Sequence, residues 1–333
     1  MNTARLVALC IAVSASPLTA LAGPSGYHVI DRIGGPDGGW DYASFDAGRD
    51  RVLVARSTAV NAFDLKSRTV TGAFAPAAWG HAAFPINGGA EVLITNGAKA
   101  MVTFVDAKTG SPLATLPTGL APDDAIIDPK SGLLLVMNHV GGDITLIDPR
   151  AHKVVATIPV GGRLEAAAVD GQGRAFVNVE DRNEIAVVDI AARQVTARYP
   201  LAGCDGPTGI AYAPADRLLI SSCEGLAEVV DADSGKVVRQ VRIGDGADGV
   251  AFDTRRKLAF VSAGKSGTLS VISVVRGDAR LVDTVPTQKG ARTLTLDPAS
   301  GRVFLPTAQY VAGVGGGRPT VAPGTFELLI VGR

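Results

Sequence analysis

An excess of either charge is missing from this chain of 333 residues, in which 32 lysines and arginines balance 32 aspartates and glutamates. A near-neutral protein has no general attraction for nucleic acid or for an anionic membrane surface, so we expect no nucleic-acid partner. The sequence also lacks a Cys-x-x-Cys-His haem attachment site, a glycine-rich phosphate loop and any cluster of its four histidines. No motif indicates a reaction, and we predict no cofactor.

Long apolar runs are missing as well, apart from one at the N-terminus. Residues 1–22 have the layout of a secretory signal: Arg5, then an apolar stretch from Leu6 to Val13, then Ala20-Leu21-Ala22 as a cleavage site. Polar residues and Pro17 interrupt the stretch, which makes it shorter than the roughly 20 apolar residues that a membrane-spanning helix needs. We therefore expect an exported, periplasmic protein with no membrane span.

Cysteine is scarce, with three in the chain. Cys10 lies inside the apolar stretch and leaves a lipoprotein anchor as an alternative, although Leu9 stands where a lipobox has a small residue. The mature chain, residues 23–333, keeps Cys204 and Cys223. An even pair in an exported protein predicts a disulfide, and two free buried thiols are the alternative.

The chain is rich in glycine, with 40 residues, and in proline, with 19, a composition typical of short strands joined by tight turns. One short pattern, mostly apolar and usually ending in aspartate, recurs along the chain. Its copies are Val60–Asp64, Val102–Asp106, Ile144–Asp148, Ile185–Asp189, Ala227–Asp231, Leu269–Ser273 and Phe326–Val331. Successive terminal aspartates are 42, 42, 41 and 42 residues apart, a period that indicates the blades of a β-propeller.

Each repeat unit contains four apolar runs separated by turn-forming residues. In the third unit these runs are Asp124–Ile127, Leu133–Met137, Ile144–Ile147 and Lys153–Ile158. Four strands per period of about 42 residues predict an all-β propeller of four-stranded antiparallel blades. The first run, expected to be the inner strand, occurs seven times. We therefore predict a single seven-bladed β-propeller over residues 23–333, with blades that begin near residues 40, 80, 122, 164, 207, 247 and 291.

The two ends of the chain are expected to complete one blade. The last repeat has only two strands after its inner one, Arg302–Leu305 and Phe326–Val331, and so lacks an outer strand. Residues 27–34 resemble the outer strand of the third unit and have no blade before them. We expect residues 27–34 to be the outer strand of blade seven, which closes the ring and removes its open edges. Because a closed ring needs no oligomer for stability, we expect a monomer.

Four segments carry a family resemblance: Val154–Gly161, Asp231–Val238, Gly246–Asp253 and Pro323–Arg333. In these segments the chain resembles the bacterial YncE-like proteins, which are built from YVTN-type propeller repeats. The resemblance covers essentially the whole mature chain. It implies a propeller without an assigned reaction, and hence a non-enzymatic binding or scaffolding module.

One residue per blade stands at the entrance of the inner strand, on the face that surrounds the mouth of the central channel. These residues are Asp41, Gly80, Asp123, Glu165, Thr208, Asp248 and Arg292, and the next position adds His81 and Asp124. Because four of the seven are carboxylates, the ring is suited to hold a divalent cation or a cationic group of a partner. The alternative is that the side chains cap turns, with Arg292 pairing across the ring.

Two histidines add to the metal alternative. His81 and His139 are expected on the channel face of adjacent blades, whereas His152 is expected in a turn of the opposite face. Together with Asp123 and Asp124, the first two form a candidate set of metal ligands. No contiguous motif fixes such a site, and each histidine is otherwise an ordinary solvated loop residue.

Two further features are expected on the same, upper face. Cys204 and Cys223 lie at that face of blade five with eighteen residues between them, so a disulfide would stabilise the fold by about 3 kcal/mol in the chain-entropy model. The segment Ala308 to Pro323 is the longest irregular one and is rich in glycine. It is expected to replace the turn between the second and third strands of blade seven, either contacting a partner or as a silent insertion.

Three functions compete for this face. The leading one is a non-enzymatic periplasmic module that binds an unidentified protein or small molecule at the upper mouth, with no catalytic residue. The alternatives are a metal-dependent, lactonase-like hydrolase and an accessory subunit of a periplasmic oxidoreductase, the latter by analogy of fold alone. For the hydrolase, the metal would be held among Asp123, Asp124, Glu165, His81 or His139.

Overall fold

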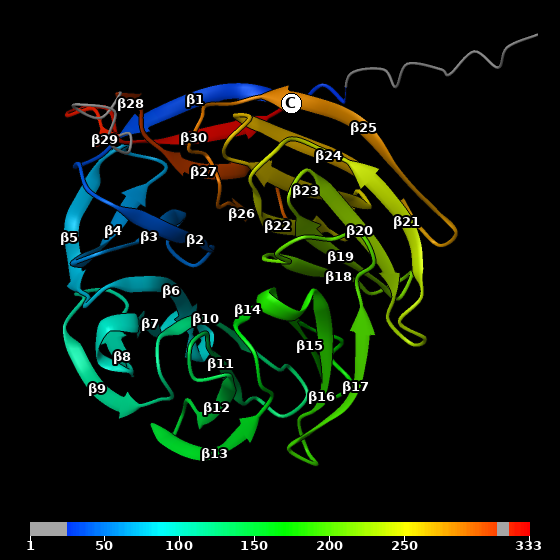
Figure 1. Cartoon of the computed structure of the whole chain (residues 1–333). Coiled ribbons are helices and arrows are strands. Elements are labelled where there is room, and N and C mark those ends of the chain that lie inside the picture. The colour runs from blue at the N-terminus through cyan, green and yellow to red at the C-terminus, as the bar shows by residue number, and fades with distance from the viewer. Residues whose placement is uncertain (1–24, 312–319) are drawn as a thin grey trace, which may run out of the picture.

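The computed structural model describes residues 25–311 and 320–333. The expected signal segment, with Cys10, lies outside the described residues. Over the described ranges the chain forms seven four-stranded antiparallel sheets arranged in a ring around a central axis (Figure 1). The predicted seven-bladed β-propeller is confirmed.

Six blades are continuous in sequence, and each runs from an inner to an outer strand. Blade one contains β2 (Trp40–Asp46), β3 (Arg51–Arg56), β4 (Ala59–Asp64) and β5 (Val70–Pro76). Blade two contains β6 (Gly80–Ile86), β7 (Glu91–Asn96), β8 (Met101–Asp106) and β9 (Pro112–Pro117). Blade three contains β10 (Pro122–Ile127), β11 (Leu134–Asn138), β12 (Asp143–Asp148) and β13 (Lys153–Pro159).

The next three blades follow the same order. Blade four contains β14 (Leu164–Val169), β15 (Arg174–Val179), β16 (Glu184–Asp189) and β17 (Gln194–Pro200). Blade five contains β18 (Ile210–Ala213), β19 (Leu218–Cys223), β20 (Leu226–Asp231) and β21 (Val237–Arg242). Blade six contains β22 (Ala247–Asp253), β23 (Leu258–Ala263), β24 (Thr268–Val275) and β25 (Asp278–Pro286). Short 3-10 turns occur at η1 (Asn87–Gly89), η2 (Gly97–Lys99) and η3 (Glu180–Arg182).

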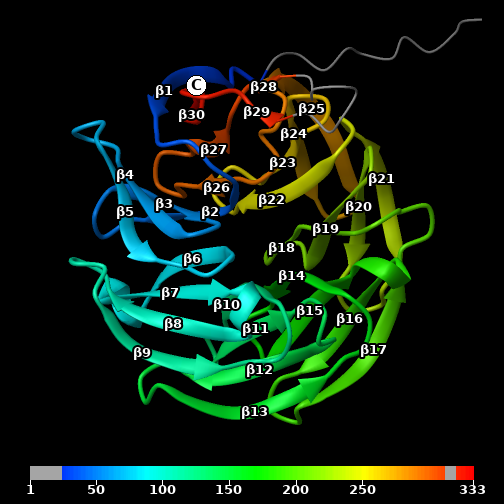
Figure 2. The same ribbon diagram turned by 60° about the vertical axis from the view of Figure 1, so that its left-hand side comes forward.

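Blade seven is assembled from both ends of the chain. Its strand order is β1-β30-β27-β26, with β26 (Thr295–Leu296), β27 (Val303–Thr307), β30 (Glu327–Gly332) and β1 (His28–Gly34). The N-terminal strand pairs antiparallel with β30, so that His28 faces Gly332 and Gly34 faces Glu327. Figure 2 shows β1 and β30 side by side, where they close the ring. The expected role of residues 27–34 as an outer strand is confirmed.

The inner strands of blades five and seven begin at Ile210 and Thr295, a few residues after the blade starts expected from the sequence. Some of the intervening residues bond to neighbouring blades as well as to their own blade. The Gly209 N–H, for example, donates to the carbonyl of Asp248 in blade six at 2.9 Å. Hydrogen bonds between blades thus connect the channel mouth in the residues that precede these two strands.

The recurring aspartate of the sequence pattern closes a turn on the lower face. The Asp64 carboxylate accepts hydrogen bonds from the backbone N–H groups of Lys66 and Ser67 at 3.0 and 2.7 Å. Asp106 does the same in the next blade. A short acidic side chain that bonds to backbone two or three residues ahead stabilises such a turn. The 42-residue period of the sequence pattern therefore reflects the repetition of this turn from one blade to the next.

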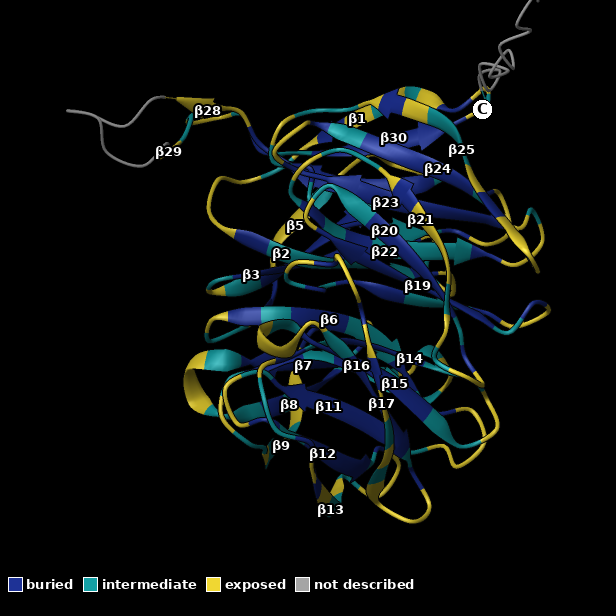
Figure 3. Cartoon of the chain, turned by 45° about the vertical axis from the view of Figure 1, so that its right-hand side comes forward, coloured by how far each residue is buried: buried dark blue, intermediate teal, exposed yellow. Residues whose placement is uncertain are grey.

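Aromatic side chains fill the spaces between blades. Phe304 of β27 stacks on Phe45 of β2 with ring centroids 5.7 Å apart, and Phe176 of β15 stacks on Tyr212 of β18 at 6.1 Å. Such contacts join consecutive blades and add to the free energy gained from burial. In Figure 3 the buried residues form a continuous band through the middle strands, and exposed residues lie mainly in the turns and outer strands.

Cys204 and Cys223 form a disulfide, with Cα atoms 5.3 Å apart, as the sequence predicts. The bond links the segment before β18 to the end of β19, which places it at the upper end of blade five. A disulfide of this kind is typical of proteins folded in an oxidising compartment. Among the described residues, no helix is long and apolar enough to cross a membrane.

The segment Ala308 to Pro323 is more regular than the sequence indicates. Its described ends pair as a two-stranded antiparallel hairpin, β28 (Tyr310–Val311) with β29 (Thr320–Val321). In Figure 3 this hairpin projects away from the ring of blades. Residues 312–319 lie outside the described residues.

Candidate functional site

A β-bulge at the entrance of five inner strands turns two residues per blade toward the channel. In blade one, regular pairing with β3 stops at Trp40 and resumes at Ala43, which leaves Asp41 and Tyr42 out of the ladder. The same shift occurs in β6, β10, β14 and β22. The charged residues released there are His81, Asp123, Asp124, Glu165 and Asp248. Because a bulge redirects side chains, apolar strands present polar groups at one end.

The bulges also settle which residue of blade two belongs to the ring. Gly80 pairs with Asn96 in the position that Trp40 has in blade one. His81 therefore takes the ring position of this blade, and Gly80 does not. A β-carbon at Gly80 would lie 2.9 Å from the backbone oxygen of Arg56, so a close backbone contact accounts for the glycine.

Polar side chains of the second strands hold the ring in place, and sequence reasoning missed them. Each donates a hydrogen bond to the backbone carbonyl of the ring residue in the following blade. These bonds join Thr95 to Asp123, Asn178 to Thr208, Ser222 to Asp248 and Ser262 to Arg292. Thr293 adds a bond between blades seven and one by donating to the carbonyl of Asp41 at 2.7 Å. A polar residue near the end of each of these mostly apolar second strands was the available signal.

The charged side chains alternate in sign around most of the mouth. The Arg292 guanidinium lies between two carboxylates, 3.1 Å from Asp248 and 3.2 Å from Asp41. The Nδ1 atom of His81 lies between the next two, 2.6 Å from Asp41 and 3.0 Å from Asp123. Each cation thus neutralises parts of two neighbouring carboxylates.

The alternation continues at His139, which follows β11. Its Nδ1 atom lies 3.0 Å from the Glu165 carboxylate and 3.1 Å from the backbone oxygen of Leu164. The hydrogen bond to Glu165 raises the pKa of His139. As expected, His152 lies apart from these groups, in a lower turn, and pairs with Glu91 at 2.8 Å.

Thr208 breaks the alternation. It occupies the ring position of blade five, between the blades of Glu165 and Asp248, and its hydroxyl is hydrogen-bonded to Ser222 at 3.0 Å. Four carboxylates therefore share three cations around the mouth: Asp41, Asp123, Glu165 and Asp248 against His81, His139 and Arg292. The unmatched negative charge falls in the sector of blade five.

The pKa values at the mouth follow from this arrangement. Burial opposes a charge on His81, but the hydrogen bonds to Asp123 and Asp41 outweigh it and raise the pKa of His81 to about 10. Burial also raises the pKa of Glu165 to about 7, with the hydrogen bond to His139 acting against it. Burial raises the pKa of Asp248 to about 6, opposed by Arg292. Each of the two carboxylates beside the gap thus has a cation on one side only, His139 for Glu165 and Arg292 for Asp248.

The ring residues surround a cavity of about 280 Å³, which is the channel mouth. Its lining includes every predicted ring residue except Gly80 and Asp124, together with His139. Asp124 lies one residue further along its strand and lines a second cavity of about 260 Å³ inside the channel. Burial there raises the pKa of Asp124 to about 7. The mouth thus leads to a channel with a fifth carboxyl group, that of Asp124, below the four of the ring.

Two sets of side chains have the composition of a metal site. In each set the potential ligand atoms lie within 4.8 Å of one another: Asp41, His81 and Asp123 in one, Asp123, His139 and Glu165 in the other. Both histidines direct Nδ1 at carboxylates, and a β-carbon at Gly97 would lie 2.8 Å from Nε2 of His81. A metal would therefore have to displace the Nδ1 proton of His81, whose pKa is about 10. Asp124, predicted as a ligand, belongs to neither set.

No protein-family model matches the chain, and no curated protein matches it. Among solved structures, 1570 chains match, so the fold is too widespread to indicate a function by itself. One of them, from the "Crystal Structure of Mitotic Checkpoint Complex", has a TM-score of 0.75 and 16% sequence identity, and the match covers 100% of this chain and 99% of that chain. At this identity the likeness shows the propeller fold alone. The YncE-like resemblance gains no support from these comparisons.

Proposed function

We propose that this protein is a non-enzymatic binding module whose channel mouth takes a positively charged group. The observation that carries the proposal is the unmatched charge beside Thr208, where the alternating ring lacks a cation. A cation placed between Glu165 and Asp248 would complete the alternation. It would also lower the pKa of both carboxylates, because an opposite charge within a few ångströms favours the ionised form.

An exported, periplasmic location and membership of the YncE-like proteins complete the proposal. The signal layout of residues 1–22 supports export, and the disulfide between Cys204 and Cys223 suits an oxidising compartment. The segments that resemble YVTN-type repeats support the family. Binding of an unidentified protein or small molecule fits the rigid ring, whose mouth is held by hydrogen bonds between blades.

An organic cation fits the mouth better than a metal ion does. An ammonium or guanidinium group brings its own N–H donors and leaves the protons of His81 and His139 in place. A metal ion needs deprotonated ligands, so its binding would release protons. The second candidate, a metal-dependent hydrolase, is favoured by the two sets of ligand atoms within 4.8 Å.

Calorimetric titration of the mature protein at pH 7 separates the two functions. Methylammonium is the probe for an organic cation, and calcium, manganese and zinc are the metal probes, each in two buffers of different ionisation enthalpy. We expect methylammonium to release less than one proton, mainly from Glu165, which is partly protonated at pH 7. A larger proton release on metal binding, from the histidine ligands as well, together with metal-dependent hydrolysis of a lactone, would establish the hydrolase. If no probe binds, the proposal fails.

A Thr208→Lys variant tests the position of the site. The new ammonium group would occupy the gap in the ring, so we expect methylammonium binding to weaken at least about tenfold. Thr208→Val removes the hydroxyl without adding charge and controls for the lost hydrogen bond. Ala98→Lys adds the same charge to an exposed position of the upper face outside the ring and should bind as the wild type does. Equal binding by Thr208→Lys would place the site elsewhere.

A further inference from the structure

A groove leads from the mouth across the upper ends of blades six and seven. Its volume is about 710 Å³, and it shares Thr208, Asp248 and Arg292 with the mouth. It therefore opens into the sector where the ring lacks a cation. A ligand whose charged end lies between Glu165 and Asp248 has a continuous path along which the rest of it can extend.

Three glycines form the floor of the groove. The Gly264 N–H donates to the carbonyl of Gly246, and the Gly290 N–H donates to the carbonyl of Gly264, both at 2.8 Å. A β-carbon at Gly290 would lie 2.6 Å from the Tyr310 ring, so a side chain there would collide with the wall. Because these peptide groups are already hydrogen-bonded, the floor suits a hydrocarbon or aromatic surface better than a peptide backbone.

One wall of the groove is aromatic. Tyr310 of the β28–β29 hairpin lines the groove and is 47% exposed, although it contacts Trp40 on one side, with ring centroids 6.3 Å apart. A half-exposed aromatic ring beside a cavity offers a large apolar contact at little cost in side-chain entropy. The hairpin, which no blade requires, thus supplies part of the groove.

Positive charge also lines the groove. Lys265 and Lys289 both contribute to the lining, and Lys265 is paired with Glu224 at 3.0 Å. Among the described residues, Lys289 forms no ion pair. Lys289 is therefore available to an anion, whereas the mouth attracts a cation. The charges of the mouth and of the groove, which share three lining residues, are complementary to a ligand that carries both a cation and an anion.

We infer that the ligand is a small organic amine with an apolar body and an anionic group at its other end. Its ammonium lies between Glu165 and Asp248, its body covers the glycine floor against Tyr310, and its anionic group faces Lys289. The inference rests on the proposed function for the ammonium end. Beyond the proposed function, it assigns the groove as part of the binding site, names the class of ligand and gives the β28–β29 hairpin a role in binding.

A series of simple probes tests each part in calorimetric titrations of the mature protein. Methylammonium probes the mouth alone, hexylammonium adds an apolar body, and 6-aminohexanoate adds the anionic end. We expect hexylammonium to bind at least about tenfold more tightly than methylammonium, because several methylene groups leave water. We expect a further gain of about two- to fivefold for 6-aminohexanoate, the usual range for an exposed ion pair. Hexanol, which lacks the charge, should bind more weakly than hexylammonium.

Two variants assign the parts of the groove. Tyr310→Ala should reduce the preference for hexylammonium over methylammonium by about three- to tenfold, whereas Val311→Ala, on the same hairpin but outside the lining, should keep it. Lys289→Ala should abolish the preference for 6-aminohexanoate over hexylammonium. If methylammonium and hexylammonium bind equally, the groove inference is overturned and the proposed function stands. If Thr208→Lys binds hexylammonium as the wild type does, the proposed function falls and the inference with it.

Discussion

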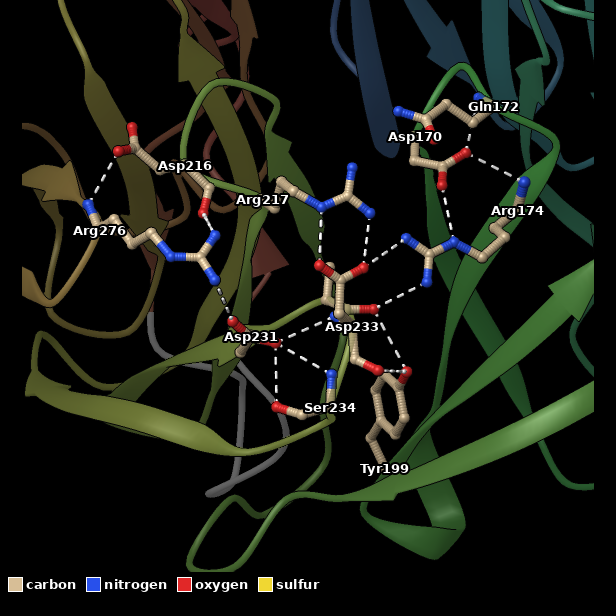
Figure 4. Close-up of polar contacts among 11 residues, drawn as sticks. Asp170, Gln172, Arg174, Tyr199, Asp216, Arg217, Asp231, Asp233, Ser234 and Arg276 are labelled. Carbon is tan, nitrogen blue, oxygen red and sulfur yellow. Dashed lines mark hydrogen bonds and ion pairs between the residues drawn. The ribbon is translucent and has the colours of Figure 1, made fainter.

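The upper mouth and the lower turns of the propeller both contain acidic side chains close to cationic ones, but the balance of charge differs between the two faces. On the lower face of blades four and five, Asp233 lies between two arginines (Figure 4). It accepts hydrogen bonds from Arg217 at 2.5 and 2.7 Å and from Arg174 at 3.1 Å. Arg174 also donates to Asp170 at 2.7 Å, and the hydrogen bonds of these arginines keep the pKa of Asp233 far below its usual range.

At the upper mouth, carboxylates outnumber cations, and burial raises the pKa values of Glu165 and Asp248 instead. Glu165 and Asp248 stand on either side of a neutral threonine, with pKa values of about 7 and about 6. Carboxylates that are fully paired within the fold serve stability. Those with a cation on one side only are available to a ligand, and that difference separates the structural face of this protein from its binding face.

The largest change in stability is expected from removing the disulfide on the binding face. Replacing Cys204 and Cys223 together by serine should lower the free energy of unfolding by about 3 kcal/mol, because the unfolded chain is no longer constrained. Urea denaturation followed by tryptophan fluorescence measures the change. The lower turns should be unaffected, and a loss well under 1 kcal/mol would show that the disulfide contributes little to this face.

Next in size is the removal of a charge on the structural face. Asp170→Asn weakens the pairing of Arg174, and the carboxylate of Asp170 is fully buried. We expect the free energy of unfolding at pH 7 to fall by about 2 kcal/mol, as for other buried pairs that lose one partner. Chemical denaturation provides the measurement. An unchanged stability would erase the distinction between the two faces.

Removing one carboxylate charge from the binding face should change the free energy of unfolding less than Asp170→Asn does, and in the opposite direction. Glu165→Gln removes a charge that has no full partner, so at pH 8 the variant should be as stable as the wild type or more stable, by less than about 1 kcal/mol. The same variant should bind methylammonium more weakly. A destabilisation equal to that of Asp170→Asn would mean that Glu165 is a structural residue.

The pH dependence of stability, to which several shifted groups contribute gradually, tests both faces at once. The folded pKa values of Glu165 and Asp248 lie above their unfolded values, so the folded protein binds more protons and stability falls as pH rises through about 4 to 7. For His81, whose pKa is raised to about 10, stabilisation is complete below about 6.5 and is lost as pH rises through 10.

The lower face acts in the opposite direction. Hydrogen bonds and arginines lower the pKa values of Asp170 and Asp233, so their stabilisation is present above the unfolded pKa of about 3.8 and is lost in acid. We therefore expect a melting temperature that is highest at about pH 4 to 5 and declines toward pH 10. A melting temperature that is highest above pH 7 in scanning fluorimetry would contradict the predicted loss of stability as the mouth carboxylates ionise.

The sequence alone predicts the fold because its strongest signals are local. The aspartate turns, such as that of Asp64, recur in five successive blades, and the missing outer strand shows how the ring closes. The same alignment finds Asp41, Asp123, Glu165 and Asp248, because each stands at the entrance of an inner strand.

What the sequence does not show depends on contacts between blades. The placement of His81 between two carboxylates and the bond from Thr95 to the next blade arise only once the ring is closed. The separation of Asp124 from Asp123 results from a bulge, and the groove combines residues of three blades with Tyr310. None of these follows from the spacing of residues within one repeat.

The central claim is that the mouth holds uncompensated negative charge that a ligand cation neutralises. A carbon-13 NMR titration of the side-chain carboxyl groups tests it most directly, with Glu165→Gln and Asp248→Asn used for assignment. The account predicts pKa values of about 7 for Glu165 and about 6 for Asp248, both falling when methylammonium is added to saturation. Ordinary values near 4 for both groups, unchanged by methylammonium, would contradict it.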